Sequence, residues 1–202
     1  MQYFKLYSMD GVMEGIEGHV RTFLQASGSH GFDHTARVTR LCRTIGIRED
    51  ADMAILIPAA LFHDIARPIE DEMGLPHEEK GAEMAEVYLR SINYSEECIP
   101  AITHAIRAHR YTKGIPPKTP EAKILSDADK LDAMGAFGIA RTFMQAGEED
   151  TGINGAVDHI NEKLLKLKER MYTESGRRIA EQRHAFLKVF LEELAREELE
   201  KI

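Results

Sequence analysis

Apolar residues recur at helical spacing along nearly the whole chain, and this pattern restricts the fold more than any other feature. Val12, Ile16 and Val20, for example, stand four residues apart and would share one face of a helix. Convincing alternation of apolar and polar residues, typical of a half-buried strand, is absent from the sequence. With 202 residues, 43% of them hydrophobic, the chain can build one core. The sequence therefore predicts an all-α fold, a compact single-domain helical bundle over residues 1–202, with its C-terminal helices packed on the core.

Glycine, proline and capping residues divide the helical pattern into segments. The first expected helix starts after Asp10. Six further helices are expected over Asp33 to Gly46, Glu49 to Ile65 with a kink at Pro58, His77 to Arg90, Glu96 to His109, Glu121 to Leu131 and Ala133 to Ala146. One long helix is expected to carry Ile160, Leu164, Leu167 and Met171, and a last helix Leu187, Phe190, Leu191 and Leu194. The expected loops are an acidic one from Glu70 to Pro76, a proline-containing one from Thr112 to Pro120 and a third from Gly147 to Gly155.

Charge and composition argue against several classes of protein. The net charge is −8 and no long basic stripe occurs, which disfavours general nucleic-acid binding. The first residues lack the apolar core of a signal peptide, and the longest apolar run, Met53 to Phe62, is too short to span a bilayer. Cys42 and Cys98 have no metal-ligand spacing and are typical of a reducing compartment. We therefore expect a cytoplasmic protein that binds neither nucleic acid nor membrane.

The dipeptide His63-Asp64 follows directly on an apolar segment and precedes Arg67 and Pro68. A histidine and an aspartate are costly to bury there unless they find partners, and a divalent cation would provide one. On its own the dipeptide is weak evidence, because such pairs often arise by chance. The interpretation therefore depends on other potential ligands in the chain.

His34 and Asp129 are the two residues that would complete such a site. Together with His63 and Asp64 they form a mixed nitrogen and oxygen donor set. This set suits Mn²⁺, Fe²⁺, Ni²⁺, Co²⁺ or Mg²⁺ better than a structural zinc, which usually recruits cysteine. Four protein ligands on a six-coordinate ion would leave room for water and a substrate oxygen, the arrangement that metal-assisted phosphoryl transfer requires.

The chain at this point resembles the HD-domain metal-dependent phosphohydrolase superfamily. The superfamily pattern of a histidine, then His-Asp, then a distant aspartate is matched in order by His34, His63, Asp64 and Asp129. The stretch Ser126-Asp127-Ala128-Asp129-Lys130-Leu131-Asp132-Ala133-Met134-Gly135-Ala136 resembles the small stand-alone YedJ/YpgQ-like branch and is far more specific than His-Asp alone. The likeness runs from about residue 30 to the C-terminal helix. It implies an HD-type helical bundle with these four residues as metal ligands.

Several charged residues near these ligands have two readings each. Arg67 could grip a substrate phosphate, or it could pair with Asp64 or Glu70. Lys130, next to the metal aspartate, has the same two readings. Asp132 is a reasonable acid to support Asp129 or to accept a water proton, but it could also belong to a solvated acidic turn.

His77 and His109 are further candidates. His77 opens an expected helix and His109 closes one. Some HD proteins have histidines at comparable places that bind a second metal or the leaving phosphate. Either residue could instead be an ordinary capping residue.

The resemblance implies a phosphohydrolase acting on nucleotides, with cleavage of a nucleoside triphosphate to monophosphate and pyrophosphate as the first choice. Asp64, Arg67, His109, Lys130 and Asp132 would then form the catalytic set. The alternatives are a nucleotidase or phosphodiesterase with the same metal centre, and a metal- or nucleotide-binding regulatory module without turnover. The expected partner is a small phosphate-bearing substrate. A homodimer through the C-terminal apolar stripe stays open beside the simpler reading of that stripe as core.

Overall fold

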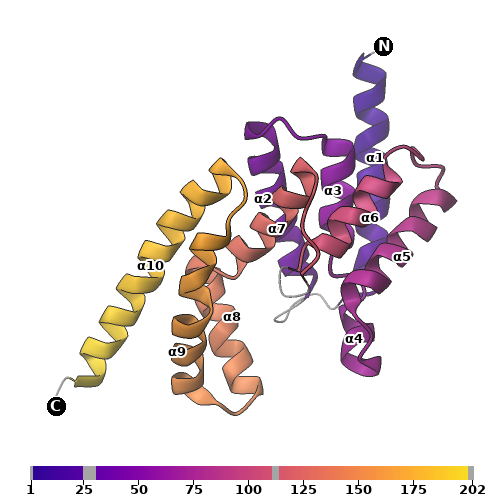
Figure 1. Ribbon diagram of the computed structural model, residues 1–202. Helices are drawn as coiled ribbons and strands as arrows, with labels where there is room; N and C mark the ends of the chain where they lie inside the picture. The colour runs from indigo at the N-terminus through magenta and orange to yellow at the C-terminus, as the bar shows by residue number, and fades with distance from the viewer. Residues whose placement is uncertain (1, 25–30, 111–113, 200–202) are drawn as a thin grey trace. The chain divides into compact units, whose positions relative to one another are not determined.

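The computed structural model describes residues 2–24, 31–110 and 114–199, and all regular structure in these ranges is helical (Figure 1). The prediction of an all-α fold is confirmed. Two compact units make up the chain, Met1–Ser126 and Asp127–Ile202, called here the N-terminal and C-terminal units. The boundary falls within helix α7 (Pro120–Asp132). Within the described residues, no helix combines the length and apolarity needed to cross a bilayer.

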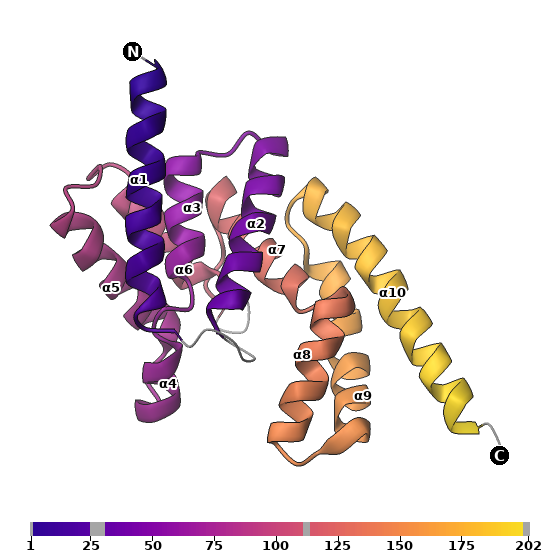
Figure 2. The ribbon, with the colours of Figure 1, turned by 180° about the vertical axis from the view of Figure 1, so that it is seen from behind.

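The N-terminal unit is built around α3, whose residues from Leu56 to Phe62 are all buried. Because this helix is apolar on every side, it must be covered from several directions. Helices α1, α2, α5 and α6 pack on it, and Figure 2 shows it between α1 and α2. The helices that lie wholly in this unit are α1 (Gln2–Arg21), α2 (Phe32–Arg48), α3 (Met53–Phe62), α4 (Arg67–Met73), α5 (His77–Ser91) and α6 (Ile99–Ala108).

The ends of α3 differ from the prediction of a helix from Glu49 to Ile65. Helix α2 continues to Arg48, and Asp50 then adopts a left-handed conformation with φ of 53°, which interrupts the helical path. Asp52 caps the new helix by accepting a hydrogen bond of 2.8 Å from the backbone nitrogen of Ala54. Helix α3 ends at Phe62, so His63 and Asp64 stand just beyond it in a turn.

Helix α4 covers Glu70 to Met73 of the segment that was predicted as an acidic loop from Glu70 to Pro76, so the prediction is wrong for these residues and holds only for Gly74 to Pro76. Pro68 lies in the first turn of α4, where proline is tolerated because its missing N–H would have no helical partner. Gly74, with φ of 68°, ends the helix in the left-handed conformation. The sequence analysis placed no helix between Ile65 and His77, whereas Pro68 marks the start of one.

The starts of two further helices also differ from the prediction. Helix α1 begins at Gln2 rather than after Asp10, and α6 begins at Ile99 rather than Glu96. The predicted loop from Thr112 to Pro120 is described only from Gly114 onward, and Thr112 and Lys113 lie outside the described residues.

The C-terminal unit contains the end of α7 followed by α8 (Gly135–Glu148), α9 (Gly152–Glu162), the 3-10 helix η2 (Leu164–Arg170) and α10 (Glu174–Leu199). Helices α8 and η2 each pack on both α9 and α10. The single long helix predicted through Ile160 and Met171 is wrong, because the chain breaks at Lys163 and continues as η2. The third predicted loop is shorter than expected, since α9 already begins at Gly152. The apolar residues of the predicted stripe, Ile160, Leu164, Leu167 and Met171, are nevertheless buried.

Asp127, a fully buried residue of α7, ties the C-terminal unit together. Its carboxylate accepts hydrogen bonds from the backbone nitrogens of Tyr172 and Thr173 at 2.9 and 2.8 Å, and from the Thr173 hydroxyl at 2.8 Å. These two residues immediately precede α10. Burial raises the pKa of Asp127, and these hydrogen bonds offset part of that shift. The carboxylate therefore satisfies backbone donors that would otherwise lack partners at the start of α10.

Replacing Asp127 with alanine should destabilise the C-terminal unit. We expect a loss of about 2–3 kcal/mol, because the change strands buried donors that had a charged acceptor. Urea unfolding followed by circular dichroism measures the effect. Asp158→Ala, at an exposed position of α9, is the matched control and should stay within about 0.5 kcal/mol of the wild type. Equal stabilities for the two variants would refute the structural role of Asp127.

Candidate metal centre

Four buried histidines of the N-terminal unit surround the carboxylate of Asp64, which is itself 2% exposed. His34 lies in the first turn of α2, and His63 follows the last residue of α3. His77 is the first residue of α5, and His109 follows the last residue of α6. Four helix ends thus converge on one point, and they bring together residues as far apart in the sequence as His34 and His109.

The two oxygens of Asp64 face two different pairs of histidines. Oδ2 lies 3.5 Å from Nε2 of His34 and 3.8 Å from Nε2 of His63. Oδ1 lies 3.2 Å from Nε2 of His77 and 3.7 Å from Nε2 of His109. Asp64 therefore stands between the pairs and is the central residue of the centre.

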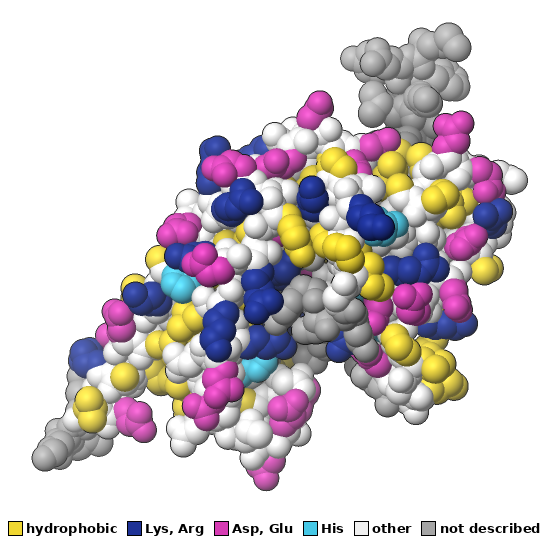
Figure 3. Space-filling view, in the orientation of Figure 1, with side chains coloured by type: hydrophobic (Ala, Val, Ile, Leu, Met, Phe, Trp, Pro, Cys, Tyr) yellow, Lys and Arg dark blue, Asp and Glu magenta, His cyan; other side chains and the backbone are white. Residues whose placement is uncertain are grey.

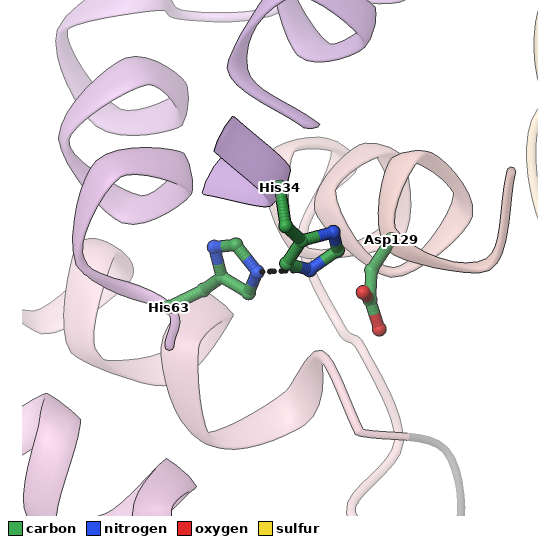
Figure 4. Close-up of side chains that lie close together, drawn as sticks. All are labelled: His34, His63 and Asp129. Atoms are coloured by element: carbon green, nitrogen blue, oxygen red, sulfur yellow. Dashed lines mark hydrogen bonds between the residues drawn. The ribbon is translucent and has the colours of Figure 1, made fainter. Parts of the chain in front are cut away.

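In the first pair, the rings of His34 and His63 meet edge to face, and their Nε2 atoms are 3.3 Å apart (Figure 4). Nδ1 of His63 lies 2.7 Å from the carbonyl oxygen of Ala60, one turn back. A carbonyl only accepts hydrogen bonds, so the ring hydrogen of neutral His63 belongs on Nδ1, and Nε2 presents a lone pair towards His34.

His34 owes its place to the start of α2. The sequence reading expected Asp33 to cap this helix, but Gly31 is the cap and Asp33 lies in the first turn. Its carboxylate accepts hydrogen bonds from the His34 backbone nitrogen at 2.8 Å and from the Arg37 guanidinium at 2.9 Å. These contacts fix the first turn of α2 and with it the backbone that carries His34.

In the second pair, the Nε2 atoms of His77 and His109 are also 3.3 Å apart. Nδ1 of His109 lies 2.6 Å from the carbonyl oxygen of Ile106, so its hydrogen is directed away from the pair. Nδ1 of His77 lies 2.7 Å from Oε2 of Glu70. This carboxylate oxygen accepts the ring hydrogen of His77, as the Ile106 carbonyl accepts that of His109. With neutral rings, both Nε2 atoms then present lone pairs to each other.

This arrangement fits a cation. The Nε2 atoms of His77 and His109 and Oδ1 of Asp64 converge, and none of the three carries a hydrogen when the rings are neutral and the acid is ionised. Three such acceptor atoms repel one another at these distances, and a divalent ion among them would replace the repulsion by attraction. These three atoms combine nitrogen and oxygen donors. The sequence analysis predicted the same combination for the ligand set that contains His34 and His63.

Glu70, on the rim of the centre, gathers three positively charged or donating groups. Its Oε2 lies 2.8 Å from Nη1 of Arg67, and its Oε1 lies 2.8 Å from Nη1 of Arg110. Burial alone would raise the pKa of Glu70, but the hydrogen bonds from Arg110 and His77 and the charges of His77 and Arg67 outweigh it and lower the pKa to about 2. The sequence analysis missed the role of this residue because it placed Glu70 in a loop.

Arg67 forms the pairs that its simpler reading predicted, and its grip on a substrate phosphate stays a prediction. It pairs with Glu70, and its Nε lies 3.4 Å from Oδ1 of Asp64. That Nε–H is buried, yet it has no hydrogen-bond acceptor within the part of the chain that the structure describes. A buried donor beside the central aspartate is a group that a substrate oxygen could satisfy.

The remaining candidates, Asp129, Lys130 and Asp132, lie on α7 in the C-terminal unit. Lys130 is buried, with Nζ 4.8 Å from the centre of the Tyr172 ring, and burial lowers its pKa although the charge of Asp127 partly opposes this. Asp132 forms an ion pair of 2.8 Å with Arg141. Within their own unit, Lys130 and Asp132 thus have structural partners, and their catalytic roles remain predictions.

Over the described surface, the charged and apolar side chains do not single out a second site. On the face shown in Figure 3, basic side chains of the described residues are interspersed with acidic ones. The apolar stripe of α10 is partly used within its own unit, since Leu187 is buried and the rings of Phe190 and Phe143 meet edge to face at 5.8 Å. A homodimer through this helix is still a prediction.

Known proteins share this arrangement of helices and motifs. The model of the HD domain family matches residues 31–134. YpgQ of Bacillus subtilis (strain 168) is 35% identical over 193 residues, which is 88% of this chain and 91% of YpgQ. The crystal structure of Bacillus subtilis YpgQ in complex with ADP superimposes with a TM-score of 0.73 at 32% identity, covering 90% of this chain and 97% of the other.

Two further matches differ in extent. The crystal structure of a predicted HD superfamily hydrolase from an uncultured Thermotogales bacterium has a TM-score of 0.72 at 33% identity, with 91% of both chains covered. Ribonuclease Y of Thermoanaerobacter pseudethanolicus (strain ATCC 33223 / 39E) is 31% identical over 111 residues, but this is 55% of the present chain and 20% of that larger protein. The likeness to the Thermotogales protein extends over most of both chains. The likeness to ribonuclease Y is confined to about half of this chain and a fifth of ribonuclease Y.

Proposed function

The chain belongs to the HD domain family, and from this premise we propose that it is a metal-dependent phosphohydrolase acting on nucleotides. The first choice of reaction is hydrolysis of a nucleoside triphosphate to the monophosphate and pyrophosphate. The observation that carries the proposal is the convergence of four buried histidines on Asp64. The solved complex of the relative YpgQ with ADP supports a nucleotide as the substrate class.

In this proposal His34, His63, Asp64 and Asp129 hold a divalent ion, which is Mn²⁺, Fe²⁺, Ni²⁺, Co²⁺ or Mg²⁺. The ion would supply Lewis acidity for a phosphoryl oxygen and activate water near neutral pH. The acceptor geometry of His77, His109 and Asp64 favours a second cation rather than a phosphate beside them, since a phosphate would add further negative charge.

The side chains of the chain itself have distinct tasks in the proposed reaction. Arg67 has a buried Nε–H without an acceptor among the described residues and would donate it to a substrate phosphate. Asp64 or Asp132 would hold or accept the proton of the attacking water at a carboxylate oxygen. Lys130 would neutralise directly the negative charge that develops on the transferred group or the leaving oxygen, whereas His109 would do so through a cation held at its Nε2.

The test is a panel of nucleotides offered to the metal-loaded protein, with phosphate and pyrophosphate quantified separately. Pyrophosphate release from triphosphates is the expected result. Phosphate release would favour a nucleotidase. Nucleotide binding without any product would favour the regulatory module.

A phosphodiesterase is the second candidate, and the partial match to ribonuclease Y favours it specifically. A short oligoribonucleotide in the same panel separates the two reactions. Cleavage of the oligonucleotide without attack on any triphosphate would overturn the first choice.

Replacing Arg67 with alanine should weaken substrate binding or turnover while metal content stays unchanged. The expected loss is on the order of 1.5–3 kcal/mol in kcat/KM, typical of a hydrogen bond to a charged group. Arg107→Ala is the matched control, because Arg107 pairs with Glu79, which is half exposed, rather than with the centre. If kinetics are unchanged with every accepted substrate, Arg67 serves only its pairs with Asp64 and Glu70.

A further inference from the structure

Among the described residues, three carboxylates surround the ring of His77, and Oε2 of Glu78, at 3.4 Å from Nδ1, is the most distant of them. Oε2 of Glu70 lies 2.7 Å from Nδ1, and Oδ1 of Asp64 lies 3.2 Å from Nε2. The His77 side chain is 0% exposed, so protein groups rather than bulk water decide where the hydrogen resides. In a neutral imidazole one nitrogen donates and the other accepts. The shortest contact favours a hydrogen on Nδ1, directed at Glu70.

Arg67 and Arg110 hold Glu70 in the ionised form that this arrangement requires. Their Nη1 atoms each lie 2.8 Å from a different oxygen of the Glu70 carboxylate. An ionised carboxylate only accepts hydrogen bonds, so Nδ1 of His77 must be the donor in their contact. Nη1 of Arg110 also approaches Nδ1 of His77 at 3.4 Å, but both atoms are then donors, and the much shorter contact with Glu70 prevails.

The need for Glu70 follows from the place of His77 in the fold. His63 and His109 orient their rings by donating Nδ1–H to the carbonyl oxygen three residues earlier, at the end of their own helices. His77 is the first residue of α5 and has no preceding turn of that helix to accept its hydrogen. A side chain from α4 supplies the acceptor instead.

We infer that Glu70 is a positioning residue that fixes the tautomer of His77, so that Nε2 of His77 presents its lone pair to Asp64 and His109. Only the assignment of that lone pair to a divalent cation rests on the proposed function. Without Glu70, the acceptor left beside Nδ1 is Glu78 at 3.4 Å, whereas Asp64 lies closer to Nε2, at 3.2 Å. The hydrogen would then pass to Nε2, which would no longer be able to bind a metal ion.

The experiment is nitrogen-15 spectroscopy of the full chain, metal-free and with histidine rings labelled, at about pH 8 to keep the rings neutral. A His77→Gln sample identifies the signals of His77. The wild type should show a hydrogen on Nδ1 of His77. Glu70→Gln retains a carbonyl oxygen and should keep this tautomer, whereas Glu70→Ala should move the hydrogen to Nε2. Glu72→Gln, at an exposed position of the same helix, is the matched control and should leave the spectrum unchanged.

Titration with Mn²⁺ provides a second measurement on the same variants. Glu70→Ala should bind the ion about 10–100-fold more weakly, the range seen when a residue supporting a metal ligand is removed. Glu72→Gln should bind it as the wild type does. Circular dichroism checks that each variant is folded, and the wild-type tautomer is decisive even if Glu70→Ala does not fold.

The outcomes separate this inference from the proposed function. A hydrogen on Nε2 of wild-type His77, or a spectrum of folded Glu70→Ala identical to that of the wild type, would overturn the role of Glu70 whatever the enzyme hydrolyses. The expected tautomers in a protein that converts none of the nucleotides would support the role of Glu70 and contradict the proposed reaction.

Discussion

Replacing Asp64 with asparagine should remove bound metal and reduce turnover by roughly 10²–10³-fold or more, the scale reported for losing one preorganised electrostatic group in an active site. Asparagine has nearly the same volume as aspartate, so the surrounding helices should keep their packing. The change removes a negative charge from the point between the two histidine pairs. It also places an amide N–H₂, which cannot bind a cation, next to one of them.

Metal content measured by mass spectrometry, together with turnover on the same samples, checks this prediction. Asp158→Asn, at an exposed position of α9, serves as the control and should retain both. If Asp64→Asn retains stoichiometric metal and wild-type turnover, the proposed centre is wrong. If it loses turnover but retains all its metal, Asp64 acts in proton transfer rather than as a ligand.

Replacing Asp129 with alanine should have a comparable effect, because the family resemblance implies that it is a ligand together with His34, His63 and Asp64. Loss of one ligand opens the coordination shell, so both metal content and turnover should fall, as is also expected for His63→Ala. Asp132→Asn is the informative comparison on the same helix. Asp132 already pairs with Arg141, and its substitution should leave the metal content at the wild-type level.

The experiment compares the metal content and the turnover of Asp129→Ala with those of Asp132→Asn. Full metal content and full turnover in Asp129→Ala would remove Asp129 from the ligand set. Equal metal loss in Asp129→Ala and Asp132→Asn would show that disturbing α7, rather than removing a ligand, causes the effect. Unfolding curves for both variants distinguish these cases from a general loss of stability.

Helical periodicity and the HD motif were sufficient to predict the fold class and the family, because both can be recognised from the order and spacing of residue types alone. The apolar spacing of α1, α2 and α5 reflects one buried face in each helix, which burial in the structure confirms. The break at Lys163 was not predictable in this way. The residues on both sides remain apolar at helical spacing, and nothing in their pattern distinguishes a 3-10 helix from a continued α-helix.

The candidate centre was only partly predictable for a related reason. His77 and His109 stood out only as residues at helix ends, and their contact across 32 residues of sequence depends on how α5 packs on α6. Glu70 could not be recognised while Glu70 to Pro76 was expected to be a loop. One signal was present, however. Arg67-Pro68 followed by Gly74 is a proline near the start and a glycine after the end, which is the pattern of a short helix.

The two rings that donate to backbone carbonyls link the centre to local unfolding. Ala60 and Ile106 are among the last four residues of α3 and α6, whose carbonyls lack a partner within a regular helix. His63 and His109 therefore act as caps of these helices, and fraying of either end would turn a ring away from Asp64. Anything that holds the rings in place would in turn slow hydrogen exchange at the ends of α3 and α6. Occupancy of the centre and the order of these two helix ends are thus coupled.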